Sequence, residues 1–260
     1  MTRENIVTNQ NIAYTVCFTE SFANFEHYSV IGYPGVPFHI LGSAHIRNCQ
    51  NEDIIQSSIK VVDDYFSKFE SETNISVLDD NFKAQKQLTN LGFLRAEKKD
   101  DTYFIFNLEG TLSKLQNLKS RYVVSRITNE REFNSFFDKN SHSNSESFMK
   151  KLKRAFAQTK IPYIHLAVAD SGKLVGFASV AIIDQAGFFM SAMVDKDYRR
   201  HGIYTLLTRE RAEVAKKYHC NLLVMETASD NLATNQFAQK LDPTDSFKRY
   251  FYQKEAKTLA

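Results

Sequence analysis

A short basic loop in the last third of the chain joins an apolar run to a helical pattern. The apolar run spans residues 188–194, and the helical pattern continues to about Tyr218. The loop between them contains Arg199, Arg200, His201 and Gly202. The first N–H groups of a helix have no partner within the helix, so they can bind an anion. This strand, loop and helix predict a phosphate cradle, and therefore an enzyme that uses a phosphate-bearing cofactor.

The segments around the loop alternate between strand and helix patterns. Predicted strands cover residues 122–127, 163–168, 174–183, 188–194, 221–227 and 247–253, and predicted helices cover 130–138, 147–158, 203–218 and 232–241. Turn residues at 170–173 and 184–187 separate three consecutive strands, which indicates a meander of antiparallel strands. The pattern is that of an α/β domain.

A faint repeat relates the two halves of the chain at an offset of about 150 residues. Asn81 and Asn231 each close an apolar strand, and Leu91 and Leu241 each follow ten residues later. Helical apolar spacing precedes both strands. The repeat predicts a duplicated fold, with a degenerate N-terminal domain at 1–118 and a second domain at 119–260.

The two halves differ where the basic loop lies. At the same offset, Arg199 to Gly202 correspond to Cys49, Gln50, Asn51 and Glu52. A carboxylate such as that of Glu52 stabilises a helix N-terminus, but it repels a phosphate. We therefore expect the first half to keep the scaffold and to have lost the cofactor.

Composition narrows the class of protein. With 43% hydrophobic and 24% charged residues, the chain is typical of soluble globular proteins. A net charge of +3 does not indicate nucleic acid as a partner, and no apolar run is long enough for a membrane span. Three widely separated cysteines have no metal-ligand spacing and favour a reducing compartment. The expectation is a cytoplasmic protein, without a metal, that is a monomer or a homodimer.

The order β-α-α-β-β-β-α-β-α-β, with a basic glycine loop after the fourth strand, resembles the GNAT acetyltransferase superfamily. The family's loop is Gln/Arg-x-x-Gly-x-Gly/Ala, and Arg199, Gly202 and Tyr204 take the three defined positions. Tyr204 stands where a small residue is usual, so it either crowds the pyrophosphate or points out of the loop. The resemblance covers residues 122–255 well and 20–110 weakly. It implies the GNAT fold, a mixed and mainly antiparallel sheet flanked by helices.

The resemblance also implies a co-substrate, acetyl-CoA, in a V-shaped opening between the fourth and fifth strands of the domain. The pyrophosphate would lie on the loop N–H groups, and the pantetheine arm would pair with the end of the fourth strand. The residues expected to bind it are Met193, Val194, Arg199, Arg200, His201, Gly202, Ile203, Tyr204, Thr205 and Asn231. The alternative is that the basic residues form a solvated turn that caps a helix.

The catalytic residues are less defined by the resemblance. Family members often carry a tyrosine acid on the helix after the fifth strand, but here that position falls on Ala238, with Phe237 adjacent. Neither can donate a proton. Glu226, near the end of an apolar strand, is the candidate general base, and a salt bridge is the ordinary alternative. His165 is interpreted as a structural histidine.

The resulting prediction is an acetyl-CoA-dependent N-acetyltransferase whose acceptor is a primary amine of a small molecule or a protein. One alternative is a CoA-binding sensor or scaffold without turnover, which the missing tyrosine favours. A third possibility is acyl transfer from a charged tRNA. That activity needs an extended basic groove, which the balanced charge does not indicate.

Overall fold

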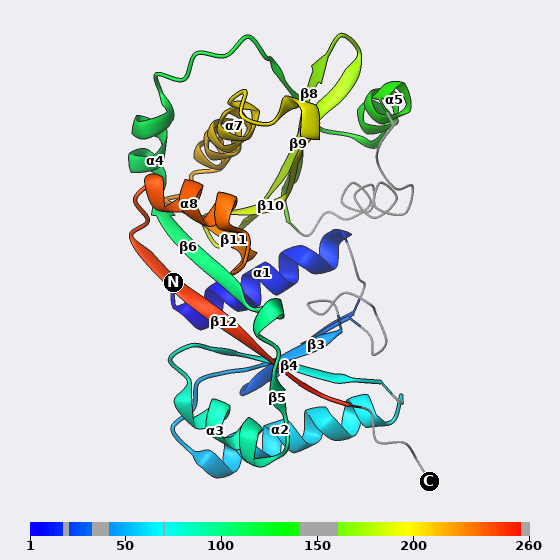
Figure 1. Ribbon diagram of the computed structural model, residues 1–260, viewed down its shortest axis with the longest axis vertical. Coiled ribbons are helices and arrows are strands. Elements are labelled where there is room, and N and C mark those ends of the chain that lie inside the picture. The colour runs from blue at the N-terminus through cyan, green and yellow to red at the C-terminus, as the bar shows by residue number, and fades with distance from the viewer. Residues whose placement is uncertain (18–20, 33–41, 70, 141–160, 256–260) are drawn as a thin grey trace. The chain divides into compact units, whose positions relative to one another are not determined.

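The computed structural model describes residues 1–17, 21–32, 42–69, 71–140 and 161–255 (Figure 1). The chain divides into two compact units with interleaved segments. The first unit comprises residues 1–103, 227–235 and 246–260, and the second comprises 104–226 and 236–245. Packing therefore assigns the described residues 246–255 to the first unit, whereas the predicted domains, 1–118 and 119–260, are contiguous. The predicted helix at 147–158 lies outside the described residues.

The first unit is built on a sheet with the strand order β1-β2-β3-β4-β12-β6. Strands β3 and β4 are parallel, and the pairs β1–β2, β2–β3 and β4–β12 are antiparallel. The elements that fall in it, entirely or in part, are α1 (Arg3–Cys17), β1 (Phe22–Asn24), β2 (Tyr28–Ile31), β3 (Ser43–Ile46), α2 (Glu52–Ser67), β4 (Thr73–Leu78), α3 (Phe82–Asn90), β5 (Leu94–Arg95), η1 (Glu97–Lys99), β6 (Asp101–Asn107) and β12 (Asp245–Lys254), and the second unit begins within β6, at Phe104.

Helix α2 forms because its apolar residues recur at helical spacing and its start is capped. The Asn51 side chain accepts hydrogen bonds from the N–H groups of Asp53 and Ile54. The buried stripe packs in one core with β3 and β4, and it consists of Ile55, Ile59, Val62 and Phe66.

The second unit contains a sheet with the strand order β11-β10-β9-β8-β7. Strands β7 to β10 are antiparallel in sequence order, which confirms the predicted meander, and β10 and β11 are parallel. The elements that fall in it, entirely or in large part, are α4 (Leu108–Leu115), β7 (Val124–Ile127), α5 (Glu130–Asn140), β8 (Tyr163–Asp170), β9 (Lys173–Ile183), β10 (Ala186–Val194), η2 (Lys196–Tyr198), α7 (Ile203–Lys217), β11 (Leu222–Ala228) and α8 (Leu232–Lys240).

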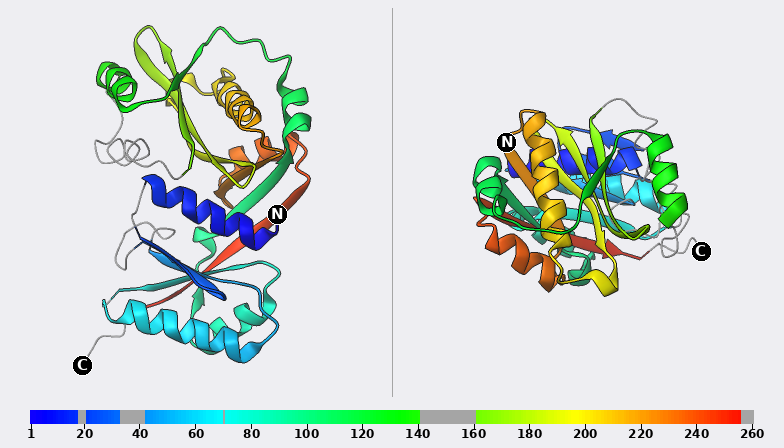
Figure 2. Two further views of the ribbon diagram at one scale, coloured as in Figure 1. Left: turned by 180° about the vertical axis from the view of Figure 1, so that it is seen from behind. Right: turned by 90° about the horizontal axis from the view of Figure 1, so that it is seen from above.

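Helix α7 lies directly against β8, β9 and β10 (Figure 2). Two glycines allow this close approach. A Cβ at Gly176 would lie 2.5 Å from Cγ2 of Ile203, and a Cβ at Gly187 would lie 2.8 Å from Cβ of Ala215. Since real Cβ atoms almost never come this close, Gly176 sets how near the start of α7 lies to the sheet, and Gly187 does the same near its end.

The two units repeat one order of elements. Helix α2, strand β4 and helix α3 in the first half correspond to α7, β11 and α8 in the second, each about 150 residues later. In both halves the helix lies between two parallel strands along the chain. Asn81 and Asn231 start α3 and α8 in the same way, by accepting a hydrogen bond from an N–H three residues on. These correspondences support the duplication.

No helix among the described residues is both long and apolar enough to cross a bilayer. The same part of the chain contains no group of three or more His, Cys, Asp or Glu side chains that could hold a metal ion.

Candidate active site

Strands β10 and β11 separate partway along their length. Their registered pairing runs from Ala186 with Leu222 to Phe189 with Met225, and it ends there. Strand β10 nevertheless continues to Val194, and β11 continues to Ala228. Among the described residues, no strand is therefore registered with the β11-facing edge of β10 beyond Phe189, as the predicted V-shaped opening requires.

The open part of β10 is held in place from its other side. Met193 pairs with Phe177 of β9, and Val194 pairs with Gly176. A bulge between Met190 and Ala192 interrupts this register at the point where β11 departs. Met193 and Val194 are half-buried. An extended ligand with amide groups could pair with such a strand edge as a further strand does.

The turn after β10 is anchored by a salt bridge. Nζ of Lys173 lies 2.9 Å from a carboxylate oxygen of Asp195, whose other oxygen accepts the N–H of Asp197. The hydrogen bond from Lys173 is the main cause that lowers the pKa of Asp195. The same bond raises the pKa of Lys173. The turn therefore begins from a charged pair that stays ionised at neutral pH.

Two residues of the loop have left-handed backbones, Arg200 with φ of 66° and Gly202 with φ of 77°. A Cβ at Gly202 would meet no atom within 4 Å. Glycine is therefore favoured here by the backbone conformation, not by lack of space. A left-handed arginine is unusual, and such strain is concentrated at functional loops.

Helix α7 begins without a cap. Its N-cap residue is Gly202, which has no side chain to accept a hydrogen bond from the first N–H groups, and its first turn has no acidic residue. Helix α2, its counterpart in the first unit, has the Asn51 cap and two acidic residues in its first turn. The start of α7 therefore combines unsatisfied N–H groups with positive helix potential, which favours an anion.

The basic side chains of the loop surround this helix start. Arg199, Arg200 and His201 are all exposed. Arg199 Nε is 3.4 Å from the carbonyl oxygen of Val194, a long hydrogen bond back to the end of β10. The side chain of Ile203 is only 1% exposed, so only its backbone can serve a ligand, while Thr205 is half-buried.

The Tyr204 side chain points away from the loop, which decides between the two sequence-based alternatives. Its hydroxyl lies 4.0 Å from Sδ of Met225 on β11. Its ring meets Phe237 of α8 edge to face, with 5.0 Å between centroids. The ring therefore does not crowd the N–H groups at the start of α7.

Sequence reasoning missed Arg211, a cation inside the second unit. Its side chain is 1% exposed, and Nη2 donates to Oγ1 of Thr208 at 3.2 Å. The guanidinium carbon lies 4.1 Å from the ring centroid of Phe189. Burial lowers the pKa of Arg211, and Tyr204 opposes that shift. Its place in the sequence could have revealed its burial, because Arg211 follows Leu207 by four residues and therefore lies on the buried face of α7.

Glu226 is the first residue of β11 beyond the registered pairs with β10. It is half-buried. Successive side chains of a strand point to opposite faces. Since Met225 contacts Tyr204 on the α7 side, Glu226 lies on the opposite face of the sheet. Its role as a base remains a prediction.

Three other residues were considered from the sequence, namely Ala238, His165 and Asn231. Ala238 is fully buried. His165 is also fully buried, with Nδ1 2.7 Å from Oγ of Ser179 and Phe177 against its ring, as a structural histidine would be. Asn231 is exposed, lies in the first unit, and its side chain accepts the N–H of Thr234 at 3.3 Å. Its contact with the cofactor remains a prediction.

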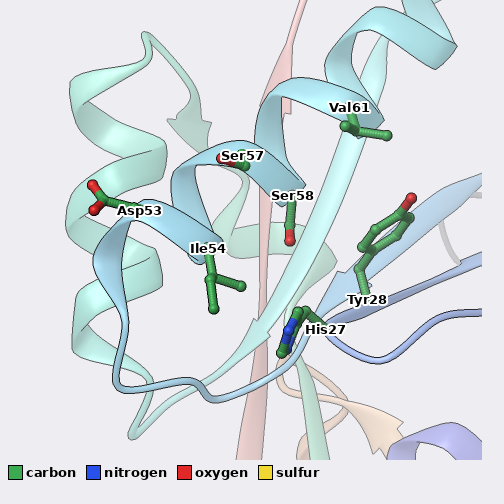
Figure 3. A pocket seen from close by; sticks show the side chains of 7 residues that line it. All are labelled: His27, Tyr28, Asp53, Ile54, Ser57, Ser58 and Val61. Atoms are coloured by element: carbon green, nitrogen blue, oxygen red, sulfur yellow. The ribbon is translucent and has the colours of Figure 1, made fainter.

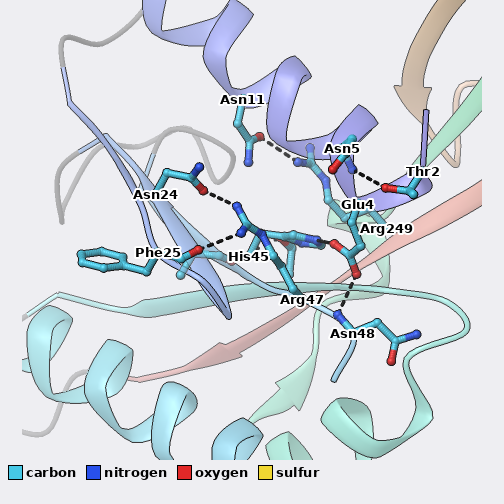
Figure 4. A network of polar contacts seen from close by, with 12 residues as sticks. Thr2, Glu4, Asn5, Asn11, Asn24, Phe25, His45, Arg47, Asn48 and Arg249 are labelled. Carbon is cyan, nitrogen blue, oxygen red and sulfur yellow. Dashed lines mark hydrogen bonds and ion pairs between the residues drawn. The ribbon is translucent and has the colours of Figure 1, made fainter. Parts of the chain in front are cut away.

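In the first unit, β3 corresponds to β10, and the carboxylate of Glu4 binds the segment that follows β3. Glu4 of α1 accepts the N–H of Asn48 at 2.8 Å, and its other oxygen lies 2.8 Å from Nε2 of His45 (Figure 4). Burial would raise the pKa of Glu4, but His45 and the Asn48 N–H outweigh burial and lower it. Because Asn51 also caps α2, this loop has its own internal acceptors. The loss of the cofactor from the first half remains a prediction.

The first unit also has an open pocket of about 300 Å³ between α2 and the start of β2 (Figure 3). The residues that line it are His27, Tyr28, Asp53, Ile54, Ser57, Ser58 and Val61. None of them was predicted as a site residue.

Residues 129–242 match the family model described as "Acetyltransferase (GNAT) family". Comparison with curated protein sequences found no match.

Among solved structures, the chain is similar to a tandem GNAT protein from the clavulanic acid biosynthesis pathway. That match has 12% identity and a TM-score of 0.68, and it covers 99% of this chain and 97% of the other. A GCN5-related N-acetyltransferase from Kribbella flavida matches with 10% identity, a TM-score of 0.68, and 98% and 97% coverage. One from Sphaerobacter thermophilus matches with 11% identity, a TM-score of 0.59, and 99% and 86% coverage. At these identities the likeness is one of fold.

Proposed function

Because the chain belongs to the GNAT superfamily, we propose that it is an acetyl-CoA-dependent N-acetyltransferase that acts on a primary amine of a small molecule or a protein. One observation carries the proposal: the pairing of β10 with β11 ends at Phe189, and the uncapped start of α7 follows the same strand. The first feature offers a strand edge to amide groups, and the second offers unsatisfied N–H groups to a diphosphate.

The residues present fit both parts of acetyl-CoA. The N–H groups from Arg200 to Thr205 would hold the pyrophosphate, with Arg199, Arg200 and His201 supplying positive charge. The backbone of Met193 and Val194 would pair with the amides of the pantetheine arm. Acetyl-CoA supplies the activated acetyl group, and the protein contributes position and proton handling.

The acceptor amine must lose a proton before or as it attacks. We assign this role to Glu226, directly or through water, because it is the first β11 residue beyond the paired segment. The acceptor itself is not identified by these residues.

Titration calorimetry with acetyl-CoA tests the proposal. The double variant Arg199→Ala/Arg200→Ala removes two exposed charges beside the helix start. At about 1 kcal/mol for each exposed charge contact, affinity should fall roughly tenfold to a hundredfold. The matched control, Lys217→Ala/Lys240→Ala, removes two exposed charges elsewhere on α7 and α8 and should bind as the wild type does.

The outcomes separate the alternatives. No binding to the wild type, or equal binding by both double variants, would refute the cradle. Binding without acetyl transfer to any amine in a broad panel would favour the sensor or scaffold, which the buried Ala238 at the usual acid position motivates.

A further inference from the structure

The pocket of the first unit has no part in the proposed acetyl transfer. It lies between α2 and the start of β2, and its volume is about 300 Å³ (Figure 3). Since one water molecule takes about 30 Å³ of the liquid, the pocket has room for a ligand of roughly ten non-hydrogen atoms. Pockets that bind small molecules begin at about this volume.

A comparison of the two units explains why space is left beside α2. Tyr28 pairs with the last residue of β3, as Gly176 pairs with the last residue of β10. In the second unit, the glycine lets the start of α7 pack on β9, because a Cβ there would lie 2.5 Å from Ile203. A tyrosine in that place excludes so close an approach. Helix α2 packs instead on β3 and β4, and the pocket remains on the side of β2.

The walls of the pocket suit a flat apolar group. Figure 3 shows Ile54 and Ser58 of α2 on one side and the Tyr28 ring on the other. The Tyr28 ring is backed by that of Phe25, with 4.6 Å between the centroids. Val61 adds an apolar side chain that is 52% exposed, at the mouth. An aromatic or alkyl group can therefore pack against a ring that is already held in place.

The charges around the pocket favour a cation over an anion. Asp53 lines the pocket and is exposed, and the neighbouring Glu52 is exposed too. Among the described residues that line it, the one base is His27, and a carboxylate oxygen of Glu26 lies 3.7 Å from its Nε2. The loop before α7 is basic, whereas the start of α2 is acidic. The first unit therefore attracts positive charge at the end of the fold where the second attracts negative charge.

We propose that this pocket is a second binding site, and that its ligand is a small primary amine with an apolar body. The ammonium group would lie at the rim beside Asp53. The body would pack between Ile54, Val61 and the Tyr28 ring, whose face also attracts a cation. The inference does not rest on the proposed acetyl transfer, because every lining residue belongs to the first unit.

A titration followed by methyl NMR tests the site without turnover. The probes are phenethylamine, 2-phenylethanol and phenylacetate, which share a phenyl ring and differ in charge. Each is added to the full chain with labelled isoleucine and valine methyl groups, in the absence of acetyl-CoA. The methyl signals of Ile54 and Val61 should shift saturably with phenethylamine, with a Kd on the order of 1 mM. Binding of 2-phenylethanol should be at least threefold weaker, and phenylacetate should cause no saturable shift.

Two variants separate charge from shape. Asp53→Asn removes the carboxylate charge and keeps the backbone donor to Asn51. It should weaken phenethylamine about threefold, the contribution of one exposed charge contact, and leave 2-phenylethanol unchanged. Its control is Glu97→Gln, which removes an exposed charge outside the pocket. Val61→Lys places a cation at the mouth and should weaken phenethylamine at least fivefold, whereas Val123→Lys, at a valine that is 77% exposed, should not.

Each outcome decides the proposal. If Ile54 and Val61 show no saturable shift at ten times the expected Kd, the site is refuted. Equal binding of phenylacetate, or wild-type binding by Asp53→Asn, would overturn the class of ligand. Shifts confined to methyl groups of the second unit would assign the amine to the proposed transfer site alone, which also overturns the inference and leaves the proposed function standing. Failure of acetyl-CoA to bind would refute the proposed function without moving the signals of Ile54 and Val61.

Discussion

Replacing Gly202 with aspartate is expected to remove most of the affinity for acetyl-CoA while preserving the fold. The position can hold a side chain, because a Cβ there meets no atom within 4 Å. The φ of 77° would cost a non-glycine residue about 1–2 kcal/mol. A domain with about 5–15 kcal/mol of unfolding free energy tolerates that cost.

The effect on binding comes from charge. The new carboxylate would stand beside the N–H groups that we propose hold the diphosphate. At about 5 Å, each charge pair repels by about 0.8 kcal/mol in water, so two phosphate charges weaken binding by more than tenfold. The lower effective dielectric near a protein surface makes the loss several times larger in free energy.

Asparagine at the same position is the control, because it shares the backbone strain and lacks the charge. Acetyl-CoA binding by Gly202→Asp and Gly202→Asn should be compared by calorimetry at low and high salt, with thermal denaturation of both. We expect the aspartate variant to bind more than tenfold weaker than the asparagine variant, and the gap to narrow with salt. Equal affinities would refute the cradle at this loop.

Two further predictions concern stability and reactivity. Gly187→Ala should lower the free energy of unfolding by about 1–3 kcal/mol in chemical denaturation, since its Cβ would lie 2.8 Å from Ala215. Gly110→Ala in α4 meets nothing closer than 3.5 Å and should instead stabilise by roughly 0.5–1 kcal/mol, and equal effects would contradict the packing argument. Burial raises the pKa of Cys220 to about 11, so Cys220 in the folded protein should react slowly with iodoacetamide at pH 8, unlike Cys220 in the unfolded protein, as mass spectrometry of its peptide would show. Its stabilising contribution is present below the unfolded pKa near 9 and should be lost between pH 9 and about 11.

The elements of the second unit could be predicted from sequence because their patterns are local. Turn residues separate β8, β9 and β10, and the apolar spacing of α7 is regular. Helix α1 was missed because part of its buried surface is polar. Asn9, Gln10 and Asn11 are buried there, and Asn11 accepts a hydrogen bond from Arg249. Periodicity of apolar residues does not reveal such a helix.

Features that depend on distant segments were beyond the reach of sequence patterns. Strand β12 packs with the first unit by pairing with β4, and no local pattern encodes that partner. The loop and its glycine were predicted, but the orientation of Tyr204 was left with two alternatives. Packing decides it, because Met225 and Phe237 receive the side chain. The place of Arg211 beside Phe189 likewise needs the fold.

Hydrogen exchange at the start of α7 tests the central claim most directly. Exchange of the amides of Ile203, Tyr204 and Thr205 should be measured with and without saturating acetyl-CoA. We expect at least a tenfold slowing at these three amides, and no change at Asp53 and Ile54, which already donate to Asn51. If acetyl-CoA binds and the α7 amides exchange at their free rate, then these groups do not hold the diphosphate.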